Sequence, residues 1–486
     1  METIINDGAY SVLSIFPIAR TIEDDAQYDK AFDQALSSIL KKNPFLKRVG
    51  PCASGCTGIK NESFRCSCFD AVDSFLGGDN VGEERGKRVY LGTTYAQWQE
   101  KPLRMDIFLK IISKKNVGIV NFNFVLDGFN VQEAIALRHI SGADFFDQQR
   151  SCLSCFSSST EAAAPLEVGA MSTLFYGIIN DLKEGMPTNT HLKGGNGDVL
   201  VNEIVSFNPK YKLQTIMELR SIDDLVDWEQ NTHLWAENHA QMVYGLITGD
   251  EGIGYIPDEF AKERISEHWA SRDFFDTIAI KNNVMLINSK ATGTLGKKYM
   301  DYQREWNQRF KGGESRIQYF TGKPCIAGFD HGILNAVERN MVILFYYDFI
   351  DHQEKRTEKQ LNKQRQKLLS FISSSMSSID EINELYETIS RASKTDLSIS
   401  RVRNRLDIQS EEMNIDYQYK NNDVIYVLTV LSLTIAVFAI QKSDNLFVGI
   451  NPFWRVLLII GTLVGCIFLS VVSTAALRWL RSRFSK

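Results

Sequence analysis

Residues 424–441 read VIYVLTVLSLTIAVFAIQ and contain no charge, and this stretch decides the predicted architecture. A second apolar run, FWRVLLIIGTLVGCIFLSVVSTAALRWL, covers residues 453–480 and is uncharged from 456 to 477. A helix that spans a bilayer needs roughly 20 apolar residues at ~1.5 Å rise each. The polar stretch KSDN at 442–445 separates the two runs. The sequence therefore predicts a C-terminal transmembrane hairpin of two helices.

Charges around this hairpin predict its orientation. The residues after the second run are basic and include no acid: Arg478, Arg481, Arg483 and Lys486. Cytoplasmic flanks of membrane helices carry an excess of Lys and Arg, so both termini are expected in the cytoplasm and residues 442–452 outside. The first ten residues, METIINDGAY, lack the basic start and apolar core of a signal peptide. The predicted location is the inner (cell) membrane, with multiple passes.

Composition excludes some classes of function. The chain of 486 residues carries 54 basic and 59 acidic residues, for a formal charge of −5. A protein that coats nucleic acid should be distinctly basic, so no nucleic-acid partner is expected. Charged residues at 23% and hydrophobic residues at 44% are ordinary for a folded chain.

The first two thirds of the chain have an alternation of strand and helix patterns, which predicts an α/β cytosolic N-terminal domain. Residues 10–19 read as a strand and 24–41 as a helix. Residues 105–113 and 117–126 predict a β-hairpin, followed by a helix at 131–139, and a second hairpin is expected at 276–280 and 284–288. The expected domains are lobe 1 at 1–150, a linker at 151–165 and lobe 2 at 166–332.

A long helical stalk is expected over 333–422, leading into the hairpin at 423–486. Residues 333–374 and 379–392 have helical patterns, and the chain from 397 onward contains no Pro or Gly before the membrane. Seven residues recur there at three- and four-residue steps: Ile399, Val402, Leu406, Gln409, Met413, Asp416 and Lys420. Such a seam is typical of a helix that packs on copies of itself. The sequence thus predicts an oligomeric funnel.

Two helices per chain cannot enclose a water path, so a pore requires a closed ring of subunits. If the first span lines its axis, the inward residues are Asn422, Tyr426, Thr429, Ser432, Leu433 and Ala436. Rings of polar side chains at the pore mouth are expected from Asp423, Asp444 and Asn445. The hydroxyls have an alternative explanation, because Thr and Ser in a helix can bond the carbonyl one turn back. The acidic residues have one too, as solvated flanks.

Cysteine spacing predicts either a metal site or free thiols. Four cysteines cluster in PCASGCTGIKNESFRCSC: Cys52, Cys56, Cys66 and Cys68. Four thiolates can hold a structural zinc, but this spacing is not that of a standard zinc knuckle. A loop with reduced surface thiols is favoured over a zinc site.

Other candidate ligands are weaker. His233 and Glu237 share one helical face, with His239 close in sequence, but without a third ligand a helix surface is favoured over a metal site. Basic Gly-rich loops suit an anionic nucleotide through Lys297, Lys298, Lys311 and Arg316. Three tryptophans are able to stack an adenine, although core positions are commoner: Trp228, Trp235 and Trp269. No arrangement typical of a nucleophilic or acid–base active site stands out, so no enzymatic activity is expected.

The α/β domain, the stalk helix running into the first span, the short outer loop and the basic tail resemble the CorA family of metal-ion transporters. The resemblance covers residues 333–486 and implies a pentameric homo-oligomer around the first span. The family's Gly-Met-Asn motif is missing at 439–441, where the first span ends. Gly449-Ile450-Asn451 is a near match beyond the KSDN segment. Magnesium selectivity is therefore not implied.

The longer N-terminal region makes the chain similar to the divergent CorA-like membrane effectors of type III CRISPR systems. This resemblance implies a ligand-gated channel in antiviral defence, whose cytosolic domain senses S-adenosylmethionine joined to AMP. Two alternatives stay open. One is a divalent metal-ion transporter for magnesium, cobalt or nickel. The other is an adaptor or enzyme that the hairpin tethers to the lipid bilayer.

Overall fold

A computed structural model gives the fold of this chain. It describes residues 3–17, 25–43, 87–98, 101–112, 117–141, 152–156, 166–185, 213–223, 231–273, 275–289, 331–352, 362, 366, 380–446, 451, 453–454, 456–457 and 460–461. The chain divides into two compact units. The first comprises Met1–Glu354 and Gln366–Val402, and the second Lys355–Arg365 and Arg403–Lys486.

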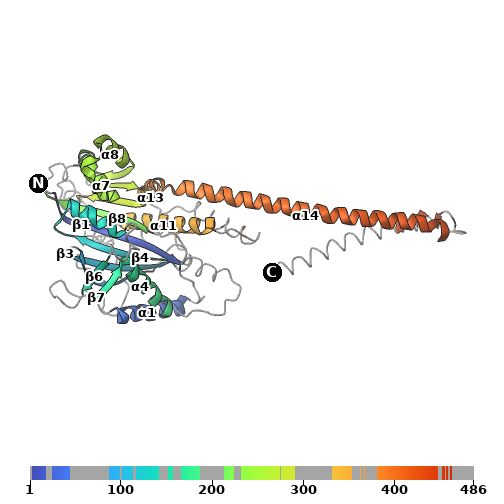
Figure 1. The fold of residues 1–486 in the computed structure, drawn as a ribbon, viewed down its shortest axis with the longest axis horizontal. Coiled ribbons are helices and arrows are strands. Elements are labelled where there is room, and N and C mark those ends of the chain that lie inside the picture. Colours follow the sequence, from blue (N-terminus) through green and yellow to red (C-terminus); the bar gives the residue numbers. More distant parts are fainter. Residues whose placement is uncertain are drawn as a thin grey trace, which may run out of the picture. The chain divides into compact units, whose positions relative to one another are not determined.

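The first unit is built on one large mixed sheet, labelled in Figure 1. Its strands are β1 (Ile4–Pro17), β2 (Lys87–Trp98), β3 (Lys101–Ile112), β4 (Val117–Leu126), β5 (Phe129–Asn130), β6 (Cys152–Phe156), β7 (Leu166–Ala170), β8 (Leu213–Ile222), β9 (His268–Arg272), β10 (Phe275–Ile280) and β11 (Asn283–Asn288). The described helices are α1 (Asp25–Lys42), α3 (Val131–Leu137), η3 (Arg138–Ser141), α4 (Met171–Gly185), α6 (Thr232–Asn238), α7 (Ala240–Thr248), η8 (Ile253–Tyr255), α8 (Asp258–Ile265), α11 (His331–His352), α13 (Asp380–Ala392) and α14 (Thr395–Leu446).

Strand β1 joins the two halves of the sheet. The described strands form the order β7-β6-β2-β3-β4-β1-β8-β11-β10-β9, with β5 beside β1. Strand β1 pairs antiparallel with β4 on one side and with β8 on the other, so that Tyr10 lies opposite both Phe124 and Met217. Strands β8 and β11 are parallel. The strands of the predicted lobes 1 and 2 therefore belong to one continuous sheet.

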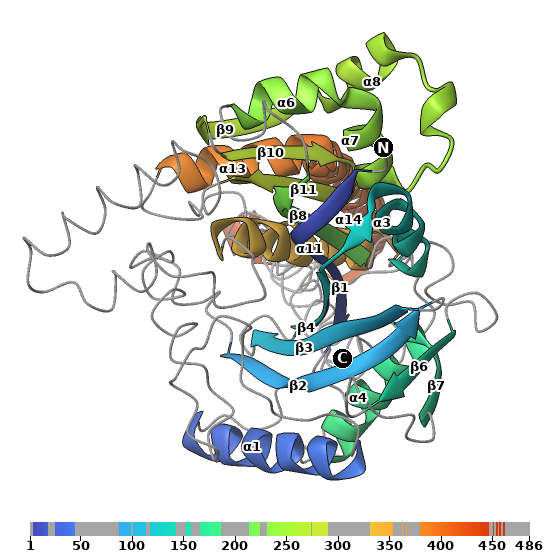
Figure 2. The same cartoon turned by 90° about the vertical axis from the view of Figure 1, so that its left-hand side faces the viewer.

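One face of the sheet carries the larger apolar core. Successive side chains of a strand point to opposite faces, and alternate residues such as Tyr10 and Val12 of β1 lie in this core. The helices that supply its other residues are α1, α3, α4, α6, α7 and α8. Figure 2 shows α6, α7 and α8 beside β9 and β10, at the opposite end of the sheet from α1 and α4. This core fixes the position of α6 relative to the sheet.

The opposite face is more polar and is covered by α11 and α13. Lys110 of β3 forms a buried ion pair with Glu338 of α11, with the Nζ and Oε2 atoms 2.7 Å apart. Asn340 of α11 donates to Ser393 Oγ at 3.0 Å and accepts from Thr395 Oγ1 at 2.6 Å. Since Ser393 lies in the turn between α13 and α14 and Thr395 is the first residue of α14, Asn340 holds the start of α14 against the sheet of the first unit.

Several local predictions are confirmed. The two expected hairpins are present as β3–β4 and β10–β11. The helix expected at 24–41 is α1, and the one expected at 379–392 is α13. Residues 152–156, inside the segment predicted as a linker, form the paired strand β6. The exact domain limits stay a prediction.

The predicted transmembrane hairpin needs a correction. Among the residues that the structure describes, no helix combines the length and apolarity required to cross a membrane. Helix α14 also continues through residues 442–445 to Leu446, where the turn between two spans was expected. Lys, Ser, Asp and Asn do not break a helix, and the chain reaches its next Gly only at 449 and its next Pro at 452. The fold class is wrong in this respect, and so is the inner-membrane location derived from it.

Candidate metal centre

The candidate site begins at the N-terminus of α6, which is tied to the turn between β9 and β10. Asn231 caps the helix by accepting a hydrogen bond from the Leu234 backbone at 3.0 Å. The Thr232 backbone N–H and side-chain hydroxyl both donate to the Asp273 carbonyl, at 2.7 and 3.1 Å. These bonds fix the first turn of α6 over the sheet and so position His233.

Strands β9 and β10 supply the other two residues. His268 pairs with Ile278 across the ladder, and Asp276 lies two residues before Ile278 on β10. Because side chains two residues apart share a face, Asp276 and His268 point to the same side as Ile278. That is the side of the core that contains α6. A register shift between Phe275 and Thr277 bends the ladder at Asp276.

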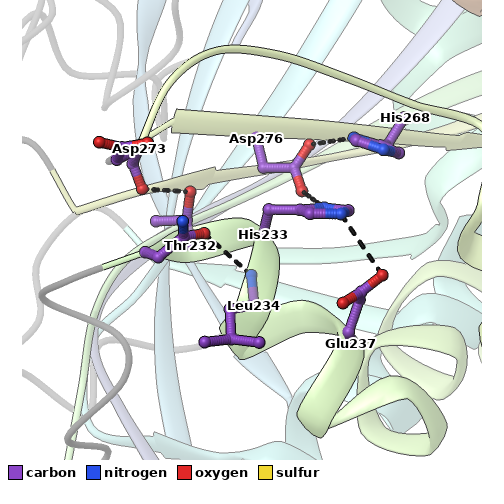
Figure 3. Close-up of polar contacts among 8 residues, drawn as sticks. Thr232, His233, Leu234, Glu237, His268, Asp273 and Asp276 are labelled. Atoms are coloured by element: carbon purple, nitrogen blue, oxygen red, sulfur yellow. Dashed lines mark hydrogen bonds and ion pairs between the residues drawn. The ribbon is translucent and has the colours of Figure 1, made fainter.

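The two imidazoles converge on the Asp276 carboxylate, as Figure 3 shows. His233 Nδ1 lies 3.0 Å from Asp276 Oδ2, and His268 Nδ1 lies 3.3 Å from Asp276 Oδ1. The two imidazole rings stack, with centroids 4.0 Å apart and planes 17° apart. Glu237, one turn after His233 on α6, places Oε1 3.5 Å from His233 Nε2. Two acids thus flank two imidazoles.

Burial differs sharply within the cluster. Asp276 is fully buried, whereas the side chains of His233 and His268 are 36% and 31% exposed. A carboxylate in an apolar interior is costly unless both oxygens are paired, and each oxygen of Asp276 has one imidazole partner. The hydrogen bond with Asp276 raises the pKa of His268 above its ordinary value. The cluster therefore has a buried anionic centre and a polar rim that reaches solvent.

This donor set fits a metal ion. His233, His268 and Asp276 each offer one ligand atom, and these atoms lie within 4.8 Å of one another. Zinc binds imidazole nitrogen and carboxylate oxygen at about 2.0–2.2 Å, so the ligand atoms must move closer together on binding. A bound metal lies in the plane of each imidazole. One of the two nearly parallel rings must therefore rotate, and their partial exposure leaves room for this.

Sequence reasoning found half of this site. It singled out His233 and Glu237 but favoured a helix surface for lack of a third ligand. His239, the other residue considered, contacts Trp235 instead, with Nδ1 2.9 Å from the Trp235 carbonyl. His268 and Asp276 were missed. Their only signal was a separation of eight residues across a strand–turn–strand segment, which places them on one face.

Among the residues that the structure describes, none of the other predicted site residues joins this cluster. The four cysteines and the four basic nucleotide-binding candidates lie outside the described residues. Of the tryptophans, Trp235 is fully buried in the core, and Trp269 donates to Glu384 at 3.2 Å. The residues expected to line or border a pore belong to α14.

On α14, Thr429 donates its hydroxyl to the Ile425 carbonyl at 2.7 Å, which is the local alternative for a hydroxyl in a helix. Asp444 and Asn445, expected in a loop, fall within the helix. Comparison with protein-family models, with curated proteins and with solved structures found no match, so the assignment of the metal centre rests on its geometry.

Proposed function

We propose that this protein binds a divalent transition-metal ion, with zinc as the first candidate, through His233, His268 and Asp276. The observation that carries the proposal is the convergence of these three groups from α6, β9 and β10 within 4.8 Å. A chance surface cluster rarely includes a fully buried carboxylate. Here Asp276 is 0% exposed and is shared between two imidazoles.

The ligand types narrow the choice of metal. Two imidazole nitrogens favour zinc, copper, nickel or iron over magnesium and calcium, which prefer all-oxygen sites. Three protein ligands leave at least one coordination position for water or for Glu237, whose side chain is 52% exposed. A partly exposed site of this kind is able to exchange its ion with solution. The proposal is therefore a metal-binding protein with an accessible centre.

The bound ion would replace the protons that now link the imidazoles to Asp276. In the metal-free cluster, each Nδ1–H donates to one carboxylate oxygen. A divalent cation in their place puts two positive charges next to the buried Asp276 carboxylate. Electrostatics thus favours occupation of the site at neutral pH.

Titration of metal-free, full-length protein with zinc tests this proposal. Calorimetry should give one site per chain, and His233→Ala, His268→Ala and Asp276→Asn should each abolish it. His239→Ala is the matched control, because His239 lies on the same helical segment but contacts Trp235. Absence of zinc binding by the wild-type protein, or equal binding by all four variants, would reject the site.

The earlier expectation of a ligand-gated channel depended on the transmembrane hairpin and is not part of this proposal. Binding of S-adenosylmethionine–AMP, assembly as a homo-oligomer and the lack of enzymatic activity stay predictions. None of them is needed for the metal centre, because its ligands all come from α6, β9 and β10 of one chain.

A further inference from the structure

Strand β9 carries contacts on both of its faces. His268 points towards α6 and the metal centre. Its neighbours in sequence, Glu267 and Trp269, point the other way because side chains alternate along an extended strand. The ladder continues through Glu267, whose carbonyl accepts from the Ala279 backbone at 3.2 Å. One metal ligand therefore lies between two residues that face the opposite side of the sheet.

Both of these neighbours bind helix α13. Arg391 Nη1 donates to Glu267 Oε2 at 3.1 Å, and Trp269 Nε1 donates to Glu384 Oε2 at 3.2 Å. Two apolar residues of α13, Leu385 and Ile389, are also fully buried. Helix α13 is thus held on the sheet partly by the two residues that flank His268.

Among the strands that the structure describes, β9 is the last in the order of the sheet and pairs with β10. Its pairing includes a register shift between Phe275 and Thr277. The described ladder pairs only some residues of β9 with β10, so side-chain contacts on its two faces help to fix its position. A displacement of β9 by contacts of His268 on one face must therefore also displace Glu267 and Trp269 on the other face.

We infer that metal binding by His233, His268 and Asp276 is coupled to the docking of α13, with β9 as the shared element. This inference rests on the proposed metal-binding function. When the ligands close around the ion, His268 and its strand are held in one position, and Glu267 and Trp269 are held with it. Coupling of this kind is reciprocal: contacts from α13 must strengthen metal binding as much as metal strengthens docking of α13.

The coupling also affects the start of α14. Helix α13 ends at Ala392, and α14 begins at Thr395. Between them Ser393 donates to the Lys281 carbonyl of the β10–β11 turn at 2.7 Å, and Lys394 has a φ of 56°. Docking of α13 and anchoring of the first turn of α14 are therefore contiguous. Metal binding therefore stabilises the junction between α13 and α14.

The experiment compares zinc affinities by calorimetry on metal-free, full-length protein. The test variant is Glu384→Ala with Arg391→Ala, which removes both polar contacts of α13 with β9 and leaves every metal ligand in place. The control is Lys42→Gln with Asp181→Asn, which removes an ion pair of 3.0 Å between α1 and α4. We expect zinc binding about threefold to tenfold weaker in the test variant and unchanged in the control.

Hydrogen exchange on the wild-type protein gives a second readout that needs no α13 variant. Zinc should slow exchange of the α13 amides, and it should not do so in His268→Ala. If wild-type protein binds zinc but the test variant has the same affinity, or if zinc leaves α13 exchange unchanged, the coupling is overturned while the metal site stands. If wild-type protein binds no zinc, both the metal site and the coupling are rejected.

Discussion

The imidazole of His233 lies over that of His268, with ring centroids 4.0 Å apart, and both rings bond the same buried carboxylate. Asp276 is fully buried, so its carboxylate depends on hydrogen-bond partners such as these two imidazoles. These contacts, between residues of α6, β9 and β10, are the basis of the proposed metal centre. They also determine how the site should respond to substitution and to pH.

Asp276→Asn should weaken both metal binding and folding. An amide has one oxygen where the carboxylate has two, so the Nδ1–H of one imidazole loses its acceptor inside the protein. We expect the free energy of unfolding of the metal-free protein to fall by about 1–3 kcal/mol, and zinc affinity to fall at least about 100-fold. Urea unfolding and calorimetry measure the two effects. Asp250→Asn, at an exposed site, should change neither.

The raised pKa of His268 gives a pH dependence of defined sign. In metal-free protein the folded state binds the His268 proton more tightly than the unfolded state does. Its contribution to stability is therefore fully present below about pH 6.5 and is lost as the pH rises through the folded pKa. The difference in unfolding free energy between wild type and His268→Gln should be larger at pH 6 than at pH 8.5. An equal difference at both values would contradict the bond with Asp276.

Zinc affinity should depend on pH in the opposite direction. The metal needs a deprotonated imidazole, so protons compete with zinc below the pKa of His268. Since Asp276 raises that pKa, the affinity should begin to fall at a higher pH than for an ordinary histidine ligand. Calorimetry across a pH series measures this. A zinc affinity that stays constant between pH 8 and pH 5.5 would exclude His268 as a ligand.

Much of the local structure was predictable from the sequence, because short-range patterns determine it. The hairpins β3–β4 and β10–β11 follow from β-rich runs around short polar turns, and α13 follows from its apolar spacing. The metal centre was only half predictable. His233 and Glu237 are one helical turn apart, whereas His268 and Asp276 reach them only through the pairing of β9 with β10 and the packing of α6.

The C-terminal end of α14 could not be predicted from polarity. The segment KSDN interrupts an apolar run, and this change in polarity predicts a turn. Polarity alone does not end a helix, because the backbone continues wherever no Gly, Pro or cap competes with it. Local sequence patterns also do not predict the pairing of β1 with β8, which joins the predicted lobes into one sheet. These two strands are far apart in the sequence.

The buried ion pair of Lys110 and Glu338 should be a major link between the sheet and α11. Glu338→Gln removes the negative charge next to a nearly buried ammonium, and breaking such a pair is expected to cost about 3–5 kcal/mol of unfolding free energy. Urea unfolding measures the loss. Asp258→Asn, which breaks the exposed pair with Lys262, should cost less than about 1 kcal/mol. Equal effects of the two variants would contradict the burial of Lys110.

Asn340→Ala should loosen the junction of α13 and α14. The substitution removes an acceptor from the buried Thr395 hydroxyl and a donor from Ser393. We expect a loss of about 1–3 kcal/mol in unfolding free energy and faster hydrogen exchange in the first turn of α14. Asn404→Ala, at an exposed position of α14, is the control and should leave exchange at residues 395–398 unchanged. Similar exchange in both variants would rule out this anchoring role.

X-ray absorption at the zinc edge, on full-length protein loaded with one equivalent of zinc, tests the metal centre most directly. We expect a first shell of nitrogen and oxygen only, at about 2.0–2.2 Å, with the outer-shell scattering of two imidazoles, and its loss in His233→Ala with His268→Ala. A shell of sulfur at about 2.3 Å would contradict the account, because it would assign the zinc to cysteines such as Cys52 and Cys56. Protein that retains no zinc would contradict it equally.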